Sequence, residues 1–74
     1  MSEEIMDLTG MRCPIPVLKA RKRIKTLEAG AKVIIHATDP GAERDFPAFC
    51  ESQGHKLLSS RWDGDTLILE IEKG

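Results

Sequence analysis

The apolar residues of this 74-residue chain change their spacing from one segment to the next, and this change limits the fold more than any other feature of the sequence. In four segments they alternate with polar residues or form short β-branched runs, which is typical of strands. In two others they recur every three or four residues, which is typical of helices. Clusters of Gly, Pro and Asp separate the segments. The predicted order is therefore strand, helix, strand, helix, strand, strand.

The third and fourth strands are predicted to form a hairpin, and the second strand is predicted to lie inside the sheet. Asp63-Gly64 is a strong signal for a tight turn between two strands. The Val33-Ile34-Ile35 run is apolar on both faces, which favours a central strand. In chain order, the predicted strands are Ile5–Leu8, Lys32–Thr38, Lys56–Trp62 and Thr66–Glu72.

The first predicted helix runs from Pro14 to about Leu27, and Gly30 supplies its stop. Its apolar stripe consists of Val17, Ala20, Ile24 and Leu27.

The second predicted helix ends at Gly54, but its start has two interpretations. Pro47 restricts the residue before it, which favours a start near Asp45. Asp39-Pro40 instead resembles a cap and a first turn earlier in the chain. The residues expected on one face of this helix are Phe46, Phe49, Cys50 and Gln53.

Two helices can cover only one face of a four-stranded sheet. The sequence therefore predicts an α+β fold, a βαβαββ two-layer α/β sandwich with both helices packed on one face of a mixed sheet. A chain of this length buries roughly 60 % of the surface that its unfolded form exposes, which is enough for one core. We expect a single domain that comprises residues 1–74.

Cys13 is the residue best placed to carry chemistry. It stands in Arg12-Cys13-Pro14-Ile15-Pro16, directly before the first helical segment, so its sulfur is expected at or beside the helix N-cap. The positive end of the helix dipole and the adjacent guanidinium both favour a thiolate, which is the reactive form of cysteine. A small, buried and inert cysteine is the alternative interpretation.

The two prolines weaken the dipole contribution. Proline suits helix entry but has no backbone N–H, so Pro14 and Pro16 remove two donors, and the N–H groups of Ile15 and Val17 remain to hold an anion. We expect the prolines to act mainly by rigidity, presenting the sulfur outward on a turn that resists fraying.

The other cysteine and the two histidines favour structural roles. Cys50 lies on the apolar face of the second predicted helix, where core packing is more common than catalysis. The sequence does not exclude a disulfide between Cys13 and Cys50, although no C-x-x-C pair indicates dithiol cycling. His36 lies within a strand and His55 follows a helix stop. Neither has ligand spacing to a cysteine, so we expect no metal site.

The net charge of −1 hides an electropositive segment, because six of the eleven basic residues fall between Leu8 and Leu27, where there is no Asp or Glu. This segment has three interpretations: a solvated face, a nucleic-acid surface or a docking surface for an acidic protein. The chain has no tyrosine and no aromatic residue among these charges, which argues against nucleic acid. The six residues are Arg12, Lys19, Arg21, Lys22, Arg23 and Lys25.

The sequence favours a cytoplasmic location. Two cysteines are too few for a disulfide framework, and no N-terminal stretch combines basic residues with a long apolar run. No apolar run approaches the roughly 20 residues that a transmembrane helix needs, so we expect no membrane association.

Two blocks of the sequence resemble the TusA/SirA-like family of small sulfur-carrier proteins. The first is Leu8-Thr9-Gly10-Met11-Arg12-Cys13-Pro14-Ile15-Pro16-Val17, which contains a C-P-x-P core. The second is the middle segment from Asp39 to Cys50. The resemblance also extends to chain length and to the order of the elements.

The resemblance implies that Cys13 accepts sulfane sulfur as a persulfide and relays it, with no cofactor. It implies that Arg12, Pro14 and Pro16 shape the presentation of the cysteine, and that Arg44 and Asp45 contribute to a partner surface. The expected partners are a donor protein, such as a cysteine desulfurase or a rhodanese, and an acceptor protein with a thiol. The pathways in the family include tRNA thiolation, molybdenum-cofactor sulfur supply and sulfur oxidation.

We expect Lys19, Arg21 and Lys22 to steer such partners towards the sulfur. Two other functions stay open. The basic helix could be the working surface of a regulatory or nucleic-acid-binding module in which Cys13 is structural. Alternatively, Cys13 could be the sensing residue of a thiol redox sensor.

Overall fold

The computed structural model describes residues 3–12 and 14–74, and Cys13 lies outside the described residues. Its elements follow the predicted order, so the α+β class and the βαβαββ arrangement are confirmed. The elements are β1 (Glu3–Leu8), α1 (Ile15–Ile24), β2 (Lys32–Ala37), α2 (Ala42–Gln53), β3 (Lys56–Asp63) and β4 (Thr66–Glu72).

The four strands form one mixed sheet in the order β1-β2-β4-β3, which confirms that β2 is central. β1 pairs with β2 in parallel, from Glu3 opposite Lys32 to Leu8 opposite Ala37. β4 is antiparallel to both of its neighbours, β2 and β3. The predicted hairpin joins β3 to β4, but its turn is Gly64-Asp65, one residue later than the expected Asp63-Gly64, because Asp63 still pairs with Thr66.

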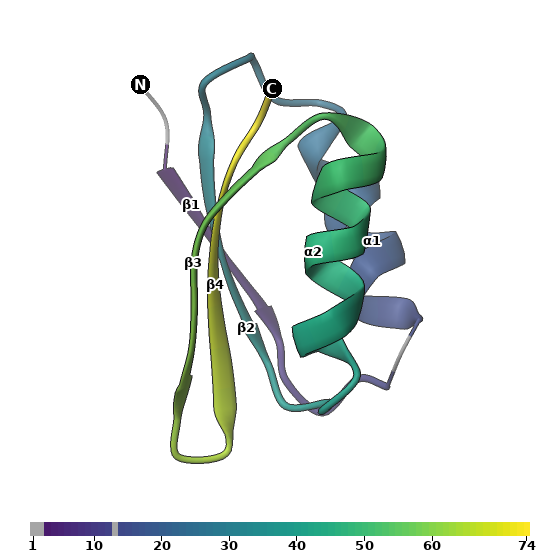
Figure 1. The fold of residues 1–74 in the computed structure, drawn as a ribbon, viewed down its shortest axis with the longest axis vertical. Coiled ribbons are helices and arrows are strands. Elements are labelled where there is room, and N and C mark those ends of the chain that lie inside the picture. The colour runs from purple at the N-terminus through teal and green to yellow at the C-terminus, as the bar shows by residue number, and fades with distance from the viewer. Residues whose placement is uncertain (1–2, 13) are drawn as a thin grey trace.

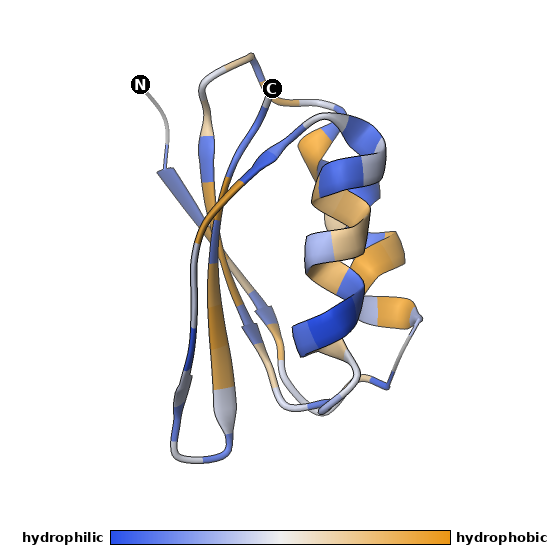
Figure 2. Ribbon diagram, viewed as in Figure 1, coloured by the Kyte–Doolittle hydropathy of each residue, from blue (hydrophilic) through white to orange (hydrophobic). Residues whose placement is uncertain are grey.

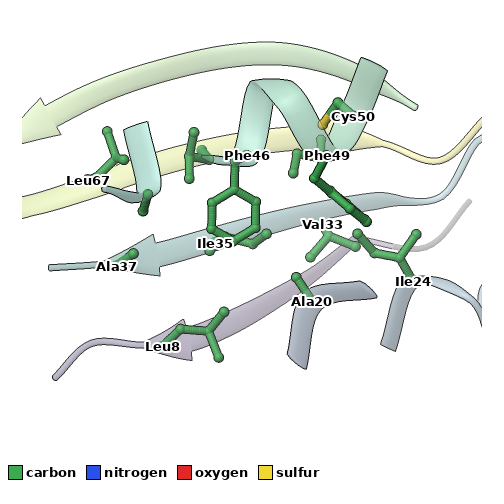
Figure 3. Packing of buried hydrophobic residues seen from close by; sticks show 13 residues of the cluster. Leu8, Ala20, Ile24, Val33, Ile35, Ala37, Phe46, Phe49, Cys50 and Leu67 are labelled. Carbon is green, nitrogen blue, oxygen red and sulfur yellow. The ribbon is translucent and has the colours of Figure 1, made fainter. Parts of the chain in front are cut away.

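Both helices lie on the same side of the sheet, as Figure 1 shows, and the core lies between the two layers. On the two central strands the residues that face this layer are completely buried, among them Ile35 on β2 and Leu69 on β4. The aromatic rings of Phe46 and Phe49 on α2 pack edge to face, with centroids 6.4 Å apart. Figure 3 shows these rings above Val33 and Ile35, with the side chains of α1 beside them.

Helix α1 ends at Ile24, three residues before the predicted end. The backbone N–H of Thr26 donates to the carbonyl of Arg23, and that of Leu27 donates to Ile24. These bonds span three residues, so the chain tightens out of the α-helix as helix ends often do. Leu27 still packs against the core, which explains why its spacing matched the helical pattern.

Helix α2 begins at Ala42, so the interpretation of Asp39-Pro40 as an earlier turn was closer than a start near Asp45. The N–H of Ala42 donates to the carbonyl of Asp39. Pro47 therefore lies inside the helix, although proline there removes a hydrogen bond. The complete burial of the preceding residue, Phe46, supplies packing that holds the helix across this position.

The predicted end of α2 at Gly54 is confirmed, because Gly54 is the C-cap with a positive φ of 75°. Gln53 lines the same depression as Phe49, but its side chain is exposed and lies outside the core. Within the described part of the chain, no helix has the length and apolar character needed to span a membrane.

Candidate functional site

The parallel pairing of β1 and β2 brings two loops together at one edge of the sheet. Each strand is followed by a helix, so residues 9–12 and residues 38–41 both leave the sheet at the carboxyl ends of the strands. A hydrogen bond joins the loops, because the N–H of Gly10 donates to Oγ1 of Thr38 over 2.8 Å. Ligand sites of α/β sheets commonly lie at such an edge.

The residues on either side of Cys13 form a defined turn at this edge. Arg12 and Pro14 are both exposed. The N–H of Ile15 donates to the carbonyl of Arg12 over 2.9 Å, which closes the turn. Pro14 is the N-cap of α1, so Cys13 is the residue directly before the cap.

The two prolines of the motif differ in their environments. Pro16 lies in the first turn of α1 and is fully buried, whereas Pro14 is exposed. Pro16 therefore anchors the start of the helix in the core, and Pro14 shapes the exposed side of the turn. The sequence suggested rigidity for both prolines but did not separate these roles.

The start of α1 offers few free donors to an anion. Pro14 and Pro16 have no N–H, and the N–H of Ile15, one of the two donors expected to remain, is already bonded to Arg12. The dipole contribution at this helix start is therefore weaker than at one with several free N–H groups. Arg12 supplies a formal positive charge on the same turn.

Most of the predicted basic surface is exposed along α1. Lys19, Arg21 and Lys22 are all exposed. Arg23 has a structural role instead, because its guanidinium binds Glu4 of β1 through contacts of 2.6 and 2.5 Å. These hydrogen bonds lower the pKa of Glu4 and raise the pKa of Arg23.

The second block places Arg44 and Asp45 in the first half of α2, close to the same edge. Arg44 is exposed and Asp45 is half-buried, and both line a shallow hollow with Pro40 and Gly41. A neighbouring hollow is lined by residues of both loops, among them Arg12 and Pro40.

A third depression runs between the two helices and brings Asp45 close to α1. It is lined by Pro14, Val17, Leu18, Arg21, Asp45, Ala48, Phe49, Ser52 and Gln53. The structure therefore gathers Arg12, Pro14, Arg44 and Asp45 around this end of the molecule, and Arg21 lines the depression that extends from it along α1. Lys19 and Lys22 line none of these depressions and lie on the outer side of α1.

Three candidate residues were missed from the sequence. Ile15 and Leu18 are exposed apolar residues on α1, at 46 % and 54 % of their full surface. Their positions outside the stripe of Val17, Ala20 and Ile24 are a signal that could have revealed them. Trp62 on β3 donates from its indole Nε1 to a carboxylate oxygen of Glu43 over 2.7 Å, a contact between distant segments that no local pattern indicates.

Cys50 is a free thiol, and its structural interpretation agrees with its burial on α2. Burial raises the pKa of this thiol, which makes the thiolate scarce at neutral pH. Cys50 follows Ala42 by eight residues, about 12 Å along the helix axis from the end of α2 that meets the loops. Figure 3 shows its sulfur beside Phe49, inside the core.

His55 lies away from the loop edge, and His36 lies on the face of the sheet that does not meet the helices. His55 follows α2 and its ring lies 5.5 Å from the ring of Phe49, with Nδ1 accepting a hydrogen bond from the N–H of Gly74. His36 lies on β2 opposite Asp7. Within residues 3–12 and 14–74, no three His, Cys, Asp or Glu side chains gather closely enough to hold a metal ion.

The chain is similar to known proteins along nearly its whole length. The family model described as sulfurtransferase TusA matches residues 4–73. YrkI of Bacillus subtilis is 40 % identical over 73 residues, which cover 99 % of this chain and 97 % of YrkI. The sulfur carrier protein TusA of Pseudomonas putida is 39 % identical over 71 residues, which cover 96 % of this chain and 89 % of that protein.

A solved structure supports the same relationship at the level of the fold. A SirA-like protein from Desulfitobacterium hafniense superposes on the chain with a TM-score of 0.82 and 25 % identity. The superposition covers 96 % of this chain and 97 % of that chain.

Proposed function

Because the chain belongs to the TusA sulfurtransferase family, we propose that it is a sulfur carrier in which Cys13 holds one sulfane sulfur atom as a persulfide. The protein receives this atom from a donor protein and delivers it to an acceptor protein. The observation that carries the proposal is the position of Cys13 between Arg12 and Pro14, two exposed residues of a closed turn at the loop edge.

The shape of this edge supports transfer between proteins. The two depressions that Pro40 lines are open to solvent, and most of their lining residues are polar or glycine. Small-molecule sites usually enclose most of their ligand in a deeper, largely apolar cavity. An exposed turn suits a reaction in which the second reactant is held by another protein.

The transfer needs one nucleophile and conserves atoms and charge. The thiolate of Cys13 attacks the outer sulfur of a donor persulfide, so a new S–S bond forms while the S–S bond of the donor breaks and the donor cysteine leaves as a thiolate. The proton on the outer sulfur remains with it, giving a Cys13 persulfide. An acceptor thiolate repeats this attack and releases the Cys13 thiolate, so the two steps require no external oxidant or reductant.

A cysteine desulfurase or a rhodanese is the proposed class of donor, and a protein thiol is the proposed acceptor. Such a relay serves tRNA thiolation, molybdenum-cofactor sulfur supply or sulfur oxidation. Arg44 and Asp45 contribute to the partner surface in this proposal, since both line the hollow beside the loop edge. Lys19, Arg21 and Lys22 provide positive charge that steers an acidic partner, an effect that salt weakens.

The decisive experiment incubates the protein with a cysteine desulfurase and cysteine, followed by intact-mass and peptide mass spectrometry. One added sulfur atom on the Cys13 peptide is expected, with none in Cys13→Ala and an unchanged amount in Cys50→Ala. Absence of the adduct, or its formation on Cys13→Ala, overturns the proposal.

The same variants distinguish the other two functions. A nucleic-acid-binding module predicts salt-dependent binding of RNA or DNA that Cys13→Ala leaves at full strength. A redox sensor predicts a sulfenic acid or a Cys13 to Cys50 disulfide after mild oxidation, with the response lost in Cys50→Ser.

A further inference from the structure

The outer side of α1 carries one row of exposed residues that begins beside the Cys13 turn. Ile15, Leu18, Lys22 and Lys25 are spaced by three, four and three residues, which places them along a single stripe of the helix surface. All four side chains are exposed, and the buried stripe of Pro16, Ala20 and Ile24 lies on the opposite side. We call these four residues the outer row.

The chemistry of the outer row changes along its length. The two residues nearest Cys13, Ile15 and Leu18, are apolar and about half-exposed, and the two that follow are lysines. Figure 2 shows the hydrophobic colour over the first turns of α1. Lys25 follows Leu18 by seven residues, so the basic part extends about 10 Å beyond the apolar part along the helix axis.

The apolar part continues into the depression between the helices. Leu18 lines this depression together with Val17 of α1 and Ala48 and Phe49 of α2. A partner surface that covers Leu18 would therefore meet further apolar side chains of both helices near the Cys13 turn. Apolar surface that is contiguous with a reactive site indicates an interaction surface.

On α1 the charges beside the outer row are all positive, whereas Asp45 of α2 is an acidic residue that lines the same depression as Leu18. The stretch between Leu8 and Leu27 contains no Asp or Glu, and Arg23 is already bound to Glu4. Lys19 and Arg21 flank the row and are exposed. A partner that covers the row therefore needs acidic side chains opposite the lysines and an apolar surface opposite Leu18.

We propose that the outer row is the docking surface for the sulfur donor, an inference that rests on the proposed carrier function. The donor presents an apolar recess beside its persulfide cysteine and a group of acidic residues about 10 Å from that recess. Leu18 fills the recess and thereby fixes the distance between the two sulfurs. Lys22 and Lys25 pair with the acidic group and thereby fix the orientation of the donor along α1.

The apolar contact is tested by Leu18→Ser, with Ile5→Ser as a matched control. Ile5 is 64 % exposed on β1, so its replacement removes a similar apolar surface far from the row. Burial of half of a leucine side chain stabilises a complex. In Leu18→Ser this burial is lost, so we expect kcat/KM for loading by a cysteine desulfurase to fall about fivefold or more. The control should load at the rate of the unmodified protein, and equal rates for both variants overturn the apolar contact.

The charged contact is tested by the double variant Lys22→Glu/Lys25→Glu, with Lys56→Glu/Arg61→Glu on β3 as a control of equal charge change. Both control residues are exposed. The outer-row variant should load more slowly at low salt, and the difference should shrink at high salt, whereas the Leu18→Ser defect should persist. A defect of the same size in the β3 variant overturns the positional claim and leaves only a net-charge effect.

Loading by a small polysulfide separates this inference from the carrier function. Leu18→Ser should accept sulfur from polysulfide at the normal rate, because no donor protein needs to dock. The lysine variant should do so at high salt, where its charge no longer repels the polysulfide anion. If polysulfide loads Cys13 but the desulfurase loads every variant equally or loads none, the docking proposal is wrong. If neither reagent loads Cys13, the carrier function itself fails. If the protein binds RNA more tightly than it binds the donor, and the lysine variant loses RNA binding, the outer row is a nucleic-acid surface and the docking proposal is wrong.

Discussion

The backbone N–H of Gly10 and the hydroxyl oxygen of Thr38 are 2.8 Å apart, so one hydrogen bond ties the loop that carries Cys13 to the loop that follows β2. Gly10 has a positive φ of 80°, a conformation that glycine adopts without the steric cost of a Cβ. The turn before the cysteine is therefore held by the loop that follows β2 as well as by its own backbone.

Replacing Thr38 with valine should slow sulfur loading with little effect on the fold. Valine keeps the shape of the side chain but removes the acceptor, and the freed N–H of Gly10 can bond to water because Gly10 is exposed. We expect a stability loss of less than about 1 kcal/mol and loading by a desulfurase slowed about threefold, since the turn is less well positioned. Thr66→Val, at a half-buried threonine of β4, is the control and should load normally.

The two motif prolines should respond differently to alanine. Pro16→Ala removes buried ring atoms and is expected to cost about 1 kcal/mol or more in the free energy of unfolding, measured by urea denaturation. Pro14→Ala acts on an exposed residue and should cost less. Equal losses in the two variants would contradict the anchoring role of Pro16.

The same pair of variants tests the donor argument at the start of α1. Pro16→Ala adds a backbone N–H in the first turn, where the N–H of Ile15 is already bonded to the carbonyl of Arg12. The added donor should stabilise an anion and lower the pKa of the Cys13 thiol. The pH dependence of alkylation of Cys13 reports this pKa, and an unchanged or raised value would contradict the expectation.

Stability should fall as the pH drops below 6.5, because of His55. Burial lowers the pKa of His55 from its ordinary value of 6.5, and the charge of Lys73 lowers it further. The unfolded chain then binds this proton at a higher pH than the folded chain, so the contribution of His55 is present above 6.5 and is lost as the pH falls towards the lowered pKa. Urea denaturation over this range should show a flatter pH dependence in His55→Gln, and the same slope in both proteins would contradict the assignment.

Cys50→Ser should destabilise the protein without affecting sulfur loading. The serine hydroxyl would be buried beside Phe49, where burial of a polar group without a partner costs about 1–3 kcal/mol. Cys50→Ala avoids the hydroxyl and is the better variant for activity assays. In the unmodified protein, alkylation should reach Cys50 much more slowly than Cys13, and equal rates would contradict the buried, inert role of Cys50.

Local patterns determined much of what the fold requires. The alternation of Leu67, Leu69 and Ile71 predicted a face that the structure buries completely, and the stripe of Ala20 and Ile24 did the same for α1. The end of α2 at Gly54 also follows from one residue, because glycine readily takes the left-handed conformation that ends a helix. These features depend on residues that are close in sequence, so their physical causes are visible in it.

The sequence also identified Cys13 and the residues around it as the candidate site. A cysteine between arginine and proline at a helix start is a local chemical signal, and the similarity to sulfur carriers extends it. Local signals did not separate the buried Pro16 from the exposed Pro14, or the paired Arg23 from the exposed Lys22. Both distinctions depend on which surface of the helix meets β1 and the core.

The tertiary structure alone decided how distant segments meet. The strand order β1-β2-β4-β3 joins the loop of Gly10 to that of Thr38, and the packing of α2 on the sheet overrides the helix-breaking tendency of Pro47. Because one side of α1 is buried against the core, Leu18, Lys22 and Lys25 on the opposite side are exposed. Strand pairing and layer packing are contacts between residues far apart in the chain, and local propensity carries no information about which of those contacts form.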